Sequence, residues 1–179
     1  PLAVFLLGAL CACVTGFDTP AIFSALKSTA ADCTAEDAAE LENYVRLWQV
    51  TKISLCEEFV RNPDGVCEGF SPEQRAKLER LNDTRKRVIE PVIALRNNLK
   101  AHSDGGEKIR DIYEFLKLSG AQKASVRLRE SAEKDGRFDD AAAAVGAYNA
   151  VINLLDGMFY MLSGRNISLS ELYSILLEA

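Results

Sequence analysis

The sequence predicts an all-α fold: a helical bundle of four to five main helices plus short helices. Apolar residues recur at steps of three and four, and Ser or Thr caps stand ahead of several of these segments. No segment alternates apolar and polar residues between hairpin turns, as a half-buried strand would. The chain has 179 residues, 48% of them hydrophobic, which suits one domain with its own core. We therefore expect a single helical domain over residues 1–179.

The first segment, Pro1–Phe17, contains no charged residue. One interpretation is the remnant of a signal peptide, with the small residues near Cys11 and Cys13 as a cleavage region. The other is a helix buried on all sides. The segment is short for a transmembrane helix, which needs about 20 residues, so no stable membrane insertion is expected. The five cysteines are odd in number and irregularly spaced, so most are expected to be small buried residues.

Start signals mark the next three helices. Thr19 followed by Pro20 predicts an N-cap with proline at the first helical position. Thr34 begins a helix whose apolar face is expected to continue to the turn at Asn62–Gly65. Ser71–Gln74 supplies a cap, a proline and a capping-box glutamine for a longer helix. The expected face of the second helix comprises Leu41, Val45, Trp48, Leu55 and Phe59.

The segment Glu73–Asp104 is the most informative. Pro91 should kink or divide it, because proline lacks the backbone donor and clashes with the preceding turn. Gly105-Gly106 is expected to end it. Apolar residues beyond residue 87 fall at alternating four- and three-residue steps, a narrow seam of the kind that two packed helices share. The seam comprises Val88, Val92, Leu95, Leu99 and His102.

Four shorter predictions complete the chain. A short helix ends at Ser119-Gly120, and a weaker one covers Gln122–Lys134. A long helix covers about Phe138–Leu162 and closes at Gly164. Ser168–Glu171 is a capping box that opens a C-terminal helix. The residues of the long helix expected to face inward are Val145, Tyr148, Ile152, Leu155 and Phe159.

Composition narrows the possible functions. The formal net charge of -5 argues against general coating of nucleic acid. The single histidine excludes sites that need two, such as the H-E-x-x-H peptidases. The sequence contains no G-x-x-x-x-G-K-[ST] phosphate loop, no G-x-G-x-x-G and no G-x-S-x-G. We expect no cofactor and no metal.

One stretch, Leu95–Asp104, carries a candidate catalytic set. His102 can exchange a proton in both directions near neutral pH. Arg96 offers a permanent forked cation suited to phosphate, and Asn97 can donate and accept hydrogen bonds. Arg96, Asn97 and His102 are the predicted catalytic residues. The predicted substrate-binding residues are Lys100, Asn98 and Ser103.

Arg96-Asn97 followed by His102 resembles the signature of the HEPN superfamily, which are all-helical domains. The ending Ala101-His102-Ser103-Asp104 resembles the branch found in abortive-infection and toxin–antitoxin systems. The resemblance covers roughly ten residues, and beyond them only the order of helices agrees. Members paired with a nucleotidyltransferase antitoxin often carry a tyrosine soon after the histidine. Ser103, Asp104 and Gly105 follow in this chain, so silencing at such a tyrosine is not expected.

The resemblance implies a metal-independent ribonuclease, as a toxin or phage-defence component in the cytoplasm. His102 would act as general acid or base when the RNA 2'-hydroxyl attacks the adjacent phosphate. Arg96 would stabilise the charge that develops there, and Asn97 would orient the reacting group. The implied partners are RNA, a cognate antitoxin and a second copy of the chain.

Helix geometry also favours a homodimer. Six residues turn a helix by about 600°, so Arg96 and His102 lie roughly 120° apart around the axis. Two copies that met along the Leu95/Leu99/His102 seam would bring both residue types together, as in the composite site of HEPN dimers.

Two other classes of function remain open. One is a HEPN-like bundle that binds RNA or protein without catalysis. The other is a secreted or envelope helical protein, favoured if Pro1–Phe17 is a signal remnant. In these cases His102 is a hydrogen-bonded interior histidine, and Arg96 pairs with Glu90 or a helix terminus.

Overall fold

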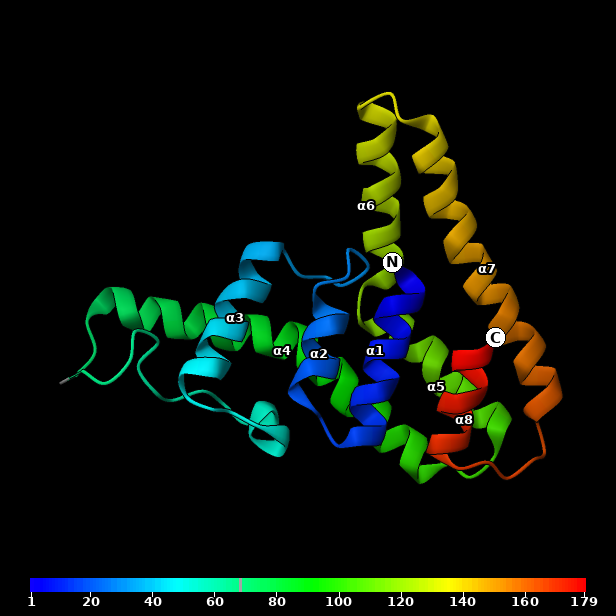
Figure 1. Cartoon of the computed structure of the whole chain (residues 1–179), viewed down its shortest axis with the longest axis horizontal. Coiled ribbons are helices and arrows are strands. Elements are labelled where there is room, and N and C mark those ends of the chain that lie inside the picture. Colours follow the sequence, from blue (N-terminus) through cyan, green and yellow to red (C-terminus); the bar gives the residue numbers. More distant parts are fainter. Residues whose placement is uncertain (68) are drawn as a thin grey trace.

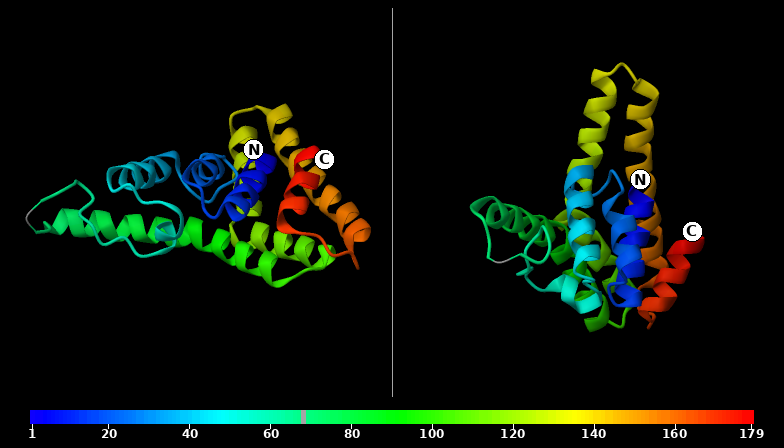
Figure 2. Two further views of the ribbon diagram at one scale, coloured as in Figure 1. Left: turned by 60° about the horizontal axis from the view of Figure 1, so that its bottom comes forward. Right: turned by 60° about the vertical axis from the view of Figure 1, so that its left-hand side comes forward.

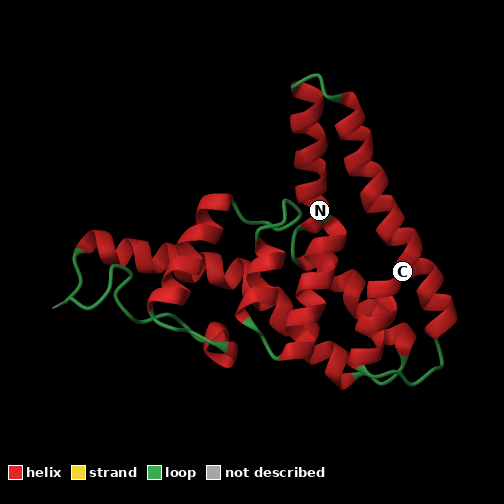
Figure 3. Cartoon of the chain, viewed as in Figure 1, coloured by secondary structure: helices red, strands yellow, loops and turns green. Residues whose placement is uncertain are grey.

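The computed structural model describes residues 1–67 and 69–179, and this part of the chain contains helices and no strand (Figure 3). The prediction of an all-α fold is confirmed. Short helices accompany the long ones, as predicted. They are α1 (Leu2–Thr15), α2 (Thr19–Leu26), α3 (Ala35–Leu47), the 3-10 helix η1 (Lys52–Cys56), α4 (Pro72–Ala101), α5 (Gly105–Leu118), α6 (Ala121–Lys134), α7 (Phe138–Leu162) and α8 (Leu169–Glu178).

Helix α1 lies at the centre of the core, in contact with α2, α4, α7 and α8 (Figure 1). Leu10 and Ala12 are fully buried, as expected for a helix without charge. Gly8 permits the close approach of α2, since a Cβ at Gly8 would lie 3.0 Å from the Cβ of Ala25. The helix is not buried on all sides, as one interpretation of Pro1–Phe17 expected, since Val4 is 53% exposed.

Helix α4 spans 30 residues and crosses the molecule beneath α1, α2 and α3 (Figure 2). Its predicted start is confirmed: the Ser71 hydroxyl accepts a hydrogen bond from the Gln74 N–H at 3.2 Å, and the Gln74 side chain accepts from the Ser71 N–H at 2.9 Å. The helix is not divided at Pro91. Proline removes one backbone hydrogen bond there, while burial of Val88 and Val92 on either side holds the helix together.

The helix expected from Thr34 to the turn at Asn62 is much shorter. Thr34 caps α3 as predicted, accepting from the Asp37 N–H at 3.0 Å, but α3 ends at Leu47. Gln49 and Lys52 adopt positive φ angles of 50° and 49°, which an α-helix does not allow. Leu55 belongs to η1 and Phe59 to the segment that follows it, and both side chains are buried. Their four-residue spacing therefore did not indicate a continuous helix.

The backbone of Phe59 makes both of its hydrogen bonds to one side chain, as it would to a neighbouring strand. Asn82 of α4 is buried, and its carbonyl oxygen accepts from the Phe59 N–H at 2.8 Å. Its amide nitrogen donates to the Phe59 carbonyl at 2.9 Å. The two bonds replace those the backbone would make in a helix.

The predicted ends of the later helices agree with the structure within a residue or two, with two corrections. Gly105-Gly106 does not end α4, because α4 ends at Ala101 and these glycines begin α5 under an Asp104 cap. Val145 does not face inward, since it is 39% exposed on α7. Helix α6 and the first part of α7 pair and project from the body as an arm, while the later part of α7 packs against α5 (Figures 1 and 2).

Within the described residues, α7 is the one helix whose length and composition would let it cross a membrane. A single helix of this kind is weak evidence for a membrane, so it does not by itself indicate a membrane protein.

Candidate functional site

The predicted catalytic residues Arg96 and His102 contact different parts of the molecule. Arg96 reaches toward the end of α1, where its Nε donates to the Cys13 carbonyl at 3.2 Å. Its guanidinium carbon also lies 5.1 Å from the centre of the Phe17 ring. Arg96 therefore ties α4 to the end of α1 through a hydrogen bond and a cation–π contact.

His102 is the C-cap residue of α4 and faces α5 instead. Its backbone N–H donates to the Asn98 carbonyl at 3.1 Å. Its ring Nδ1 lies 2.9 Å from a carboxylate oxygen of Asp111, a buried residue of α5. The histidine side chain is 42% exposed, so the imidazole lies between the buried Asp111 carboxylate and the solvent.

Lys108 completes this cluster at the end of α4. The residue is 3% exposed, and its ammonium group donates to the carbonyls of Leu99 and His102. The last carbonyls of a helix have no partner within it, so Lys108 caps α4 from the neighbouring helix. Burial lowers the pKa of Lys108, and Asp111 partly opposes this shift.

Neither Lys108 nor Asp111 was predicted from the sequence. A signal was present, because both fall on the same face of α5 as the buried Ile109, Ile112 and Phe115. A charged pair at apolar-face positions indicates buried polar groups with specific partners.

The other predicted site residues lie at the surface. Asn97, Asn98, Lys100 and Ser103 are exposed. Asn98 and Ser103 take part in the fold through their backbone carbonyls, and that of Ser103 accepts from the Ile167 N–H at 3.1 Å. Their roles in catalysis and substrate binding stay predictions.

The apolar seam of α4 is covered within the chain. Leu95 is 2% exposed and Leu99 is fully buried, in the same core as α1 and α5. A second copy could not use these side chains without opening the core. The homodimer predicted through this seam is therefore wrong, because the seam packs against helices of its own chain.

The start of α5 packs tightly against the end of α7. One Asp104 carboxylate oxygen accepts from the Glu107 N–H at 3.1 Å, and the other accepts from the Gly164 N–H at 2.6 Å. The Gly105 N–H donates to the Arg165 carbonyl at 2.9 Å. This junction fixes the base of α7, and with it the projecting arm.

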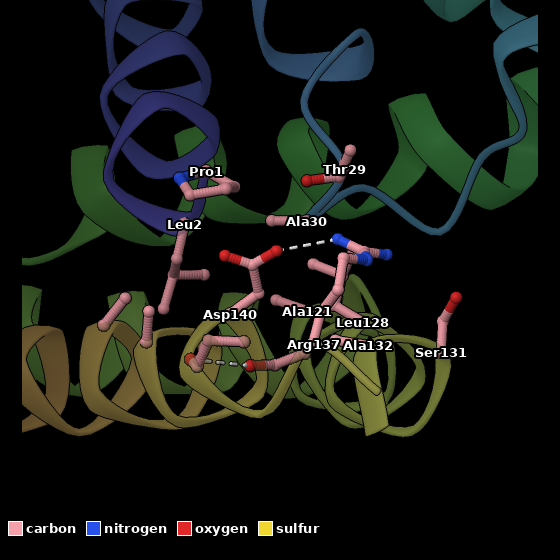
Figure 4. A pocket seen from close by; sticks show the side chains of 14 residues that line it. Pro1, Leu2, Thr29, Ala30, Ala121, Leu128, Ser131, Ala132, Arg137 and Asp140 are labelled. Atoms are coloured by element: carbon pink, nitrogen blue, oxygen red, sulfur yellow. Dashed lines mark hydrogen bonds and ion pairs between the residues drawn. The ribbon is translucent and has the colours of Figure 1, made fainter. Parts of the chain in front are cut away.

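A groove of about 410 Å³ lies where the arm meets the body (Figure 4). Its walls come from facing sides of α6 and α7, and the end nearest the body comes from the start of α1 and the loop after α2. An ion pair between Arg137 and Asp140, 2.8 Å long, stands near the tip of the arm. Most lining residues are small: Thr29, Ala30, Ala121, Ser125, Ser131, Ala132, Ala143, Ala144 and Ala147.

Across residues 1–67 and 69–179, no group of three or more His, Cys, Asp or Glu side chains is placed to hold a metal ion.

The chain is similar to bacterial proteins that are named as the B subunit of an ATP-dependent helicase/deoxyribonuclease. It is 26% identical to the one from Clostridium botulinum (strain Loch Maree / Type A3) over 178 residues, 98% of this chain and 16% of that protein. It is 29% identical to the one from Geobacillus kaustophilus over 189 residues, with the same coverage. The Bacillus subtilis protein is 32% identical over 108 residues, 60% of this chain and 9% of that protein. The chain thus spans about one sixth of the length of the first two relatives. No protein-family model matches it.

These relatives correct three predictions. The chain is similar to them over nearly all its length, whereas the HEPN resemblance covered roughly ten residues, so the HEPN assignment is wrong. The predicted ribonuclease toxin is wrong for the same reason, since the relatives are named for helicase and deoxyribonuclease activity. The predicted RNA and antitoxin partners are wrong as well, because they were implied only by that activity. Arg96-Asn97 and His102 are single residues that a helix of this composition can match by chance.

Proposed function

We propose that this chain forms a helical module in the B subunit of an ATP-dependent helicase/deoxyribonuclease and acts in DNA processing. The observation that carries the proposal is the similarity over 98% of the chain to relatives of that name. A match of this extent draws on every helix, not on one motif. A protein that is one subunit of an enzyme has at least one other protein as partner. We therefore propose a second protein chain and DNA as partners, with the cytoplasm as the location.

Within such a protein, we assign this chain a scaffolding and docking role. Its sequence has no G-x-x-x-x-G-K-[ST] phosphate loop, so the ATP dependence is assigned to residues outside it. Arg96 and His102 hold helices of this chain together. Arg96 fixes α1 on α4, and His102 with Asp111 and Lys108 fixes α5 on the end of α4.

The test uses the protein that carries this sequence, purified from its own cells with the proteins that co-purify. We expect linear duplex DNA to be degraded only when ATP is added, and RNA in EDTA to remain intact. His102→Gln should lower the thermal midpoint, yet leave the rate of DNA degradation per folded molecule within about twofold.

Two outcomes contradict the proposal. One is a preparation that degrades no DNA in the presence of ATP. The other is RNA cleavage in EDTA that disappears in both Arg96→Ala and His102→Gln while both variants stay folded.

A further inference from the structure

The arm, formed by α6 and by α7 as far as Gly146, begins at a short connection with the geometry of a hinge. Helix α6 follows α5 after only two residues, Ser119 and Gly120 (Figure 1). Gly120 has a φ of 72°, in the left-handed region that favours glycine, and a Cβ there would lie 3.1 Å from the Cβ of Asp32. Hinges are typically a few residues at the end of an element, where a change in φ and ψ redirects the chain.

The other helix of the arm also has a glycine close to the body. The junction of α5 with α7 holds the base of α7, and α7 packs against the core from about Tyr148 onward. Gly146 lies just before that part, and no neighbour lies within 4 Å of the position that its Cβ would take. Close packing therefore does not explain this glycine, which is a poor helix former. Both helices of the arm can thus bend where they meet the body.

Few large apolar side chains hold the arm against the body. The loop after α2 lines two cavities beside the arm with Ala30 and Ala31, respectively. One cavity is the groove of about 410 Å³ described above (Figure 4), and the other, of about 430 Å³, lies between α6, the loop and α4. Leu2 and Leu128 are the large aliphatic side chains in their walls. Moving the arm therefore exposes little apolar area, and so costs little free energy.

An ion pair completes the contact between the arm and the body. Arg127 of α6 donates to a carboxylate oxygen of Asp32 at 2.8 Å, and the Asp32 side chain also lies against Gly120. In the part of the chain that the structure describes, this is the one ion pair that joins the arm to the body. The two side chains are 57% and 35% exposed, so the pair is weak and salt weakens it further.

We propose that the arm moves relative to the body, bending at Gly120 and Gly146, and that the ion pair between Arg127 and Asp32 controls this movement. When the pair opens, α6 leaves the loop after α2 and the cavity of about 430 Å³ opens to solvent. An exposed pair of this kind changes the population of the open arrangement roughly twofold to fivefold. The proposal concerns contacts within the chain and does not rest on the proposed function.

The native Cys33 reports the position of the arm. It lies in the wall of this cavity, together with Ala124 and Leu128 of α6. Burial raises the pKa of the Cys33 thiol to about 11, so its reactive thiolate forms mainly while the arm is away. Labelling of the full-length protein with N-ethylmaleimide, followed for each cysteine by mass spectrometry, therefore measures the opening. The exposed Cys67 is the internal standard, and the buried Cys13 reports unfolding.

We expect Arg127→Gln to raise the labelling rate of Cys33, relative to that of Cys67, roughly twofold to fivefold. Loss of a positive charge cannot by itself speed the reaction, because nearby cations stabilise a thiolate. The matched control is Arg87→Gln, which removes an ion pair with Asp37 in the same cavity. That pair joins α4 to α3 within the body, so its loss should not raise the rate. About 1 M NaCl should bring the unmodified chain close to Arg127→Gln.

Three results would overturn the proposal. The first is a labelling ratio of Cys33 to Cys67 that Arg127→Gln leaves unchanged. The second is an equal rise of this ratio in Arg87→Gln, which would show that the arm is not involved. The third is a parallel rise in the labelling of Cys13, because the chain would then unfold instead of moving its arm.

Discussion

Lys108 places a positive charge where the chain is otherwise packed with apolar side chains. An isolated ammonium group in such a place would be strongly unfavourable. Two backbone carbonyls at the end of α4 and the nearby Asp111 compensate for the lost water. Lys108 therefore stabilises the C-terminal end of α4, although the residue belongs to α5.

Replacing Lys108 by methionine should lower the free energy of unfolding by about 2–3 kcal/mol. The change keeps the side-chain length but leaves the carbonyls of Leu99 and His102 without their charged donor. Urea unfolding measures the difference. Lys117→Met is the control, because the Lys117 side chain is 75% exposed and pairs weakly with Glu114, so its effect should stay under about 0.5 kcal/mol. Equal effects of the two changes would show that Lys108 does not cap α4.

Cys13 and Cys67 differ in environment and should differ in reactivity. Burial raises the pKa of the Cys13 thiol to about 12, because the thiolate is poorly solvated there. At pH 8 roughly one Cys13 in 10,000 would be ionised, and its sulfur is also inaccessible. Cys67 is exposed. We expect iodoacetamide at pH 8 to label Cys67 within minutes and Cys13 only after unfolding, as read by mass spectrometry. Labelling of Cys13 at a similar rate in the native protein would contradict its place in the core.

At the scale of elements, the junction of α5 with α7 depends on a missing side chain. A Cβ at Gly105 would lie 2.7 Å from the Cβ of Leu162 and 2.7 Å from its backbone carbonyl oxygen. Since a backbone atom is one of the two obstacles, the clash cannot be relieved by a rotamer change. Gly105 is thus required for close packing of the two helices.

Gly105→Ala should therefore destabilise the protein by about 1–3 kcal/mol, even though alanine favours a helix over glycine. Gly157→Ala provides the matched control on α7, where no neighbour lies within 4 Å of the added Cβ. That change should stabilise the protein by about 0.5–1 kcal/mol. Thermal or urea unfolding of both variants gives the signs. A stabilising Gly105→Ala would mean that α5 and α7 are not packed this closely.

Sequence patterns predicted three of the four capped helix starts, because a cap is a local interaction. The Thr19 cap was wrong, since Asp18 is the N-cap residue of α2 and its side chain makes no capping hydrogen bond. Ser71, Thr34 and Ser168 each accept the predicted hydrogen bond from a backbone N–H three residues on. The end of α3 was not predictable in this way. Phe59 is held by Asn82, which is 23 residues away, and apolar spacing alone cannot distinguish a helix from such a segment.

The candidate site was less predictable than the fold. Arg96 and His102 were chosen as a pair because they are close in sequence, but their partners come from α1 and α5. Gly105-Gly106 reads as a helix stop in sequence, and only the approach of α7 explains why these positions lack side chains. Contacts between different helices decide all three cases, and one sequence does not reveal them.

At the scale of the whole molecule, burial of the α4 seam within its own chain determines whether a second copy can associate through it. Leu99 is fully buried within its own chain, in a core that also contains Leu10 of α1 and Ile112 of α5. A side chain in this position stabilises the monomer, and its loss leaves a cavity that the neighbours fill only partly.

Leu99→Ala should therefore lower the free energy of unfolding by about 2–5 kcal/mol, to the same extent at every protein concentration. If Leu99 lay between two copies, the loss would depend on concentration, because dissociation would accompany unfolding. Urea unfolding at two concentrations a hundredfold apart separates the two cases. Lys100→Ala, the exposed neighbour on α4, serves as control and should change stability by less than about 0.5 kcal/mol. The opposite result would be a urea midpoint of the unmodified chain that rises with protein concentration, together with a midpoint of Leu99→Ala that does not. That result would show that the seam is an interface between two copies, and the core described for α4 would then be incomplete in one copy.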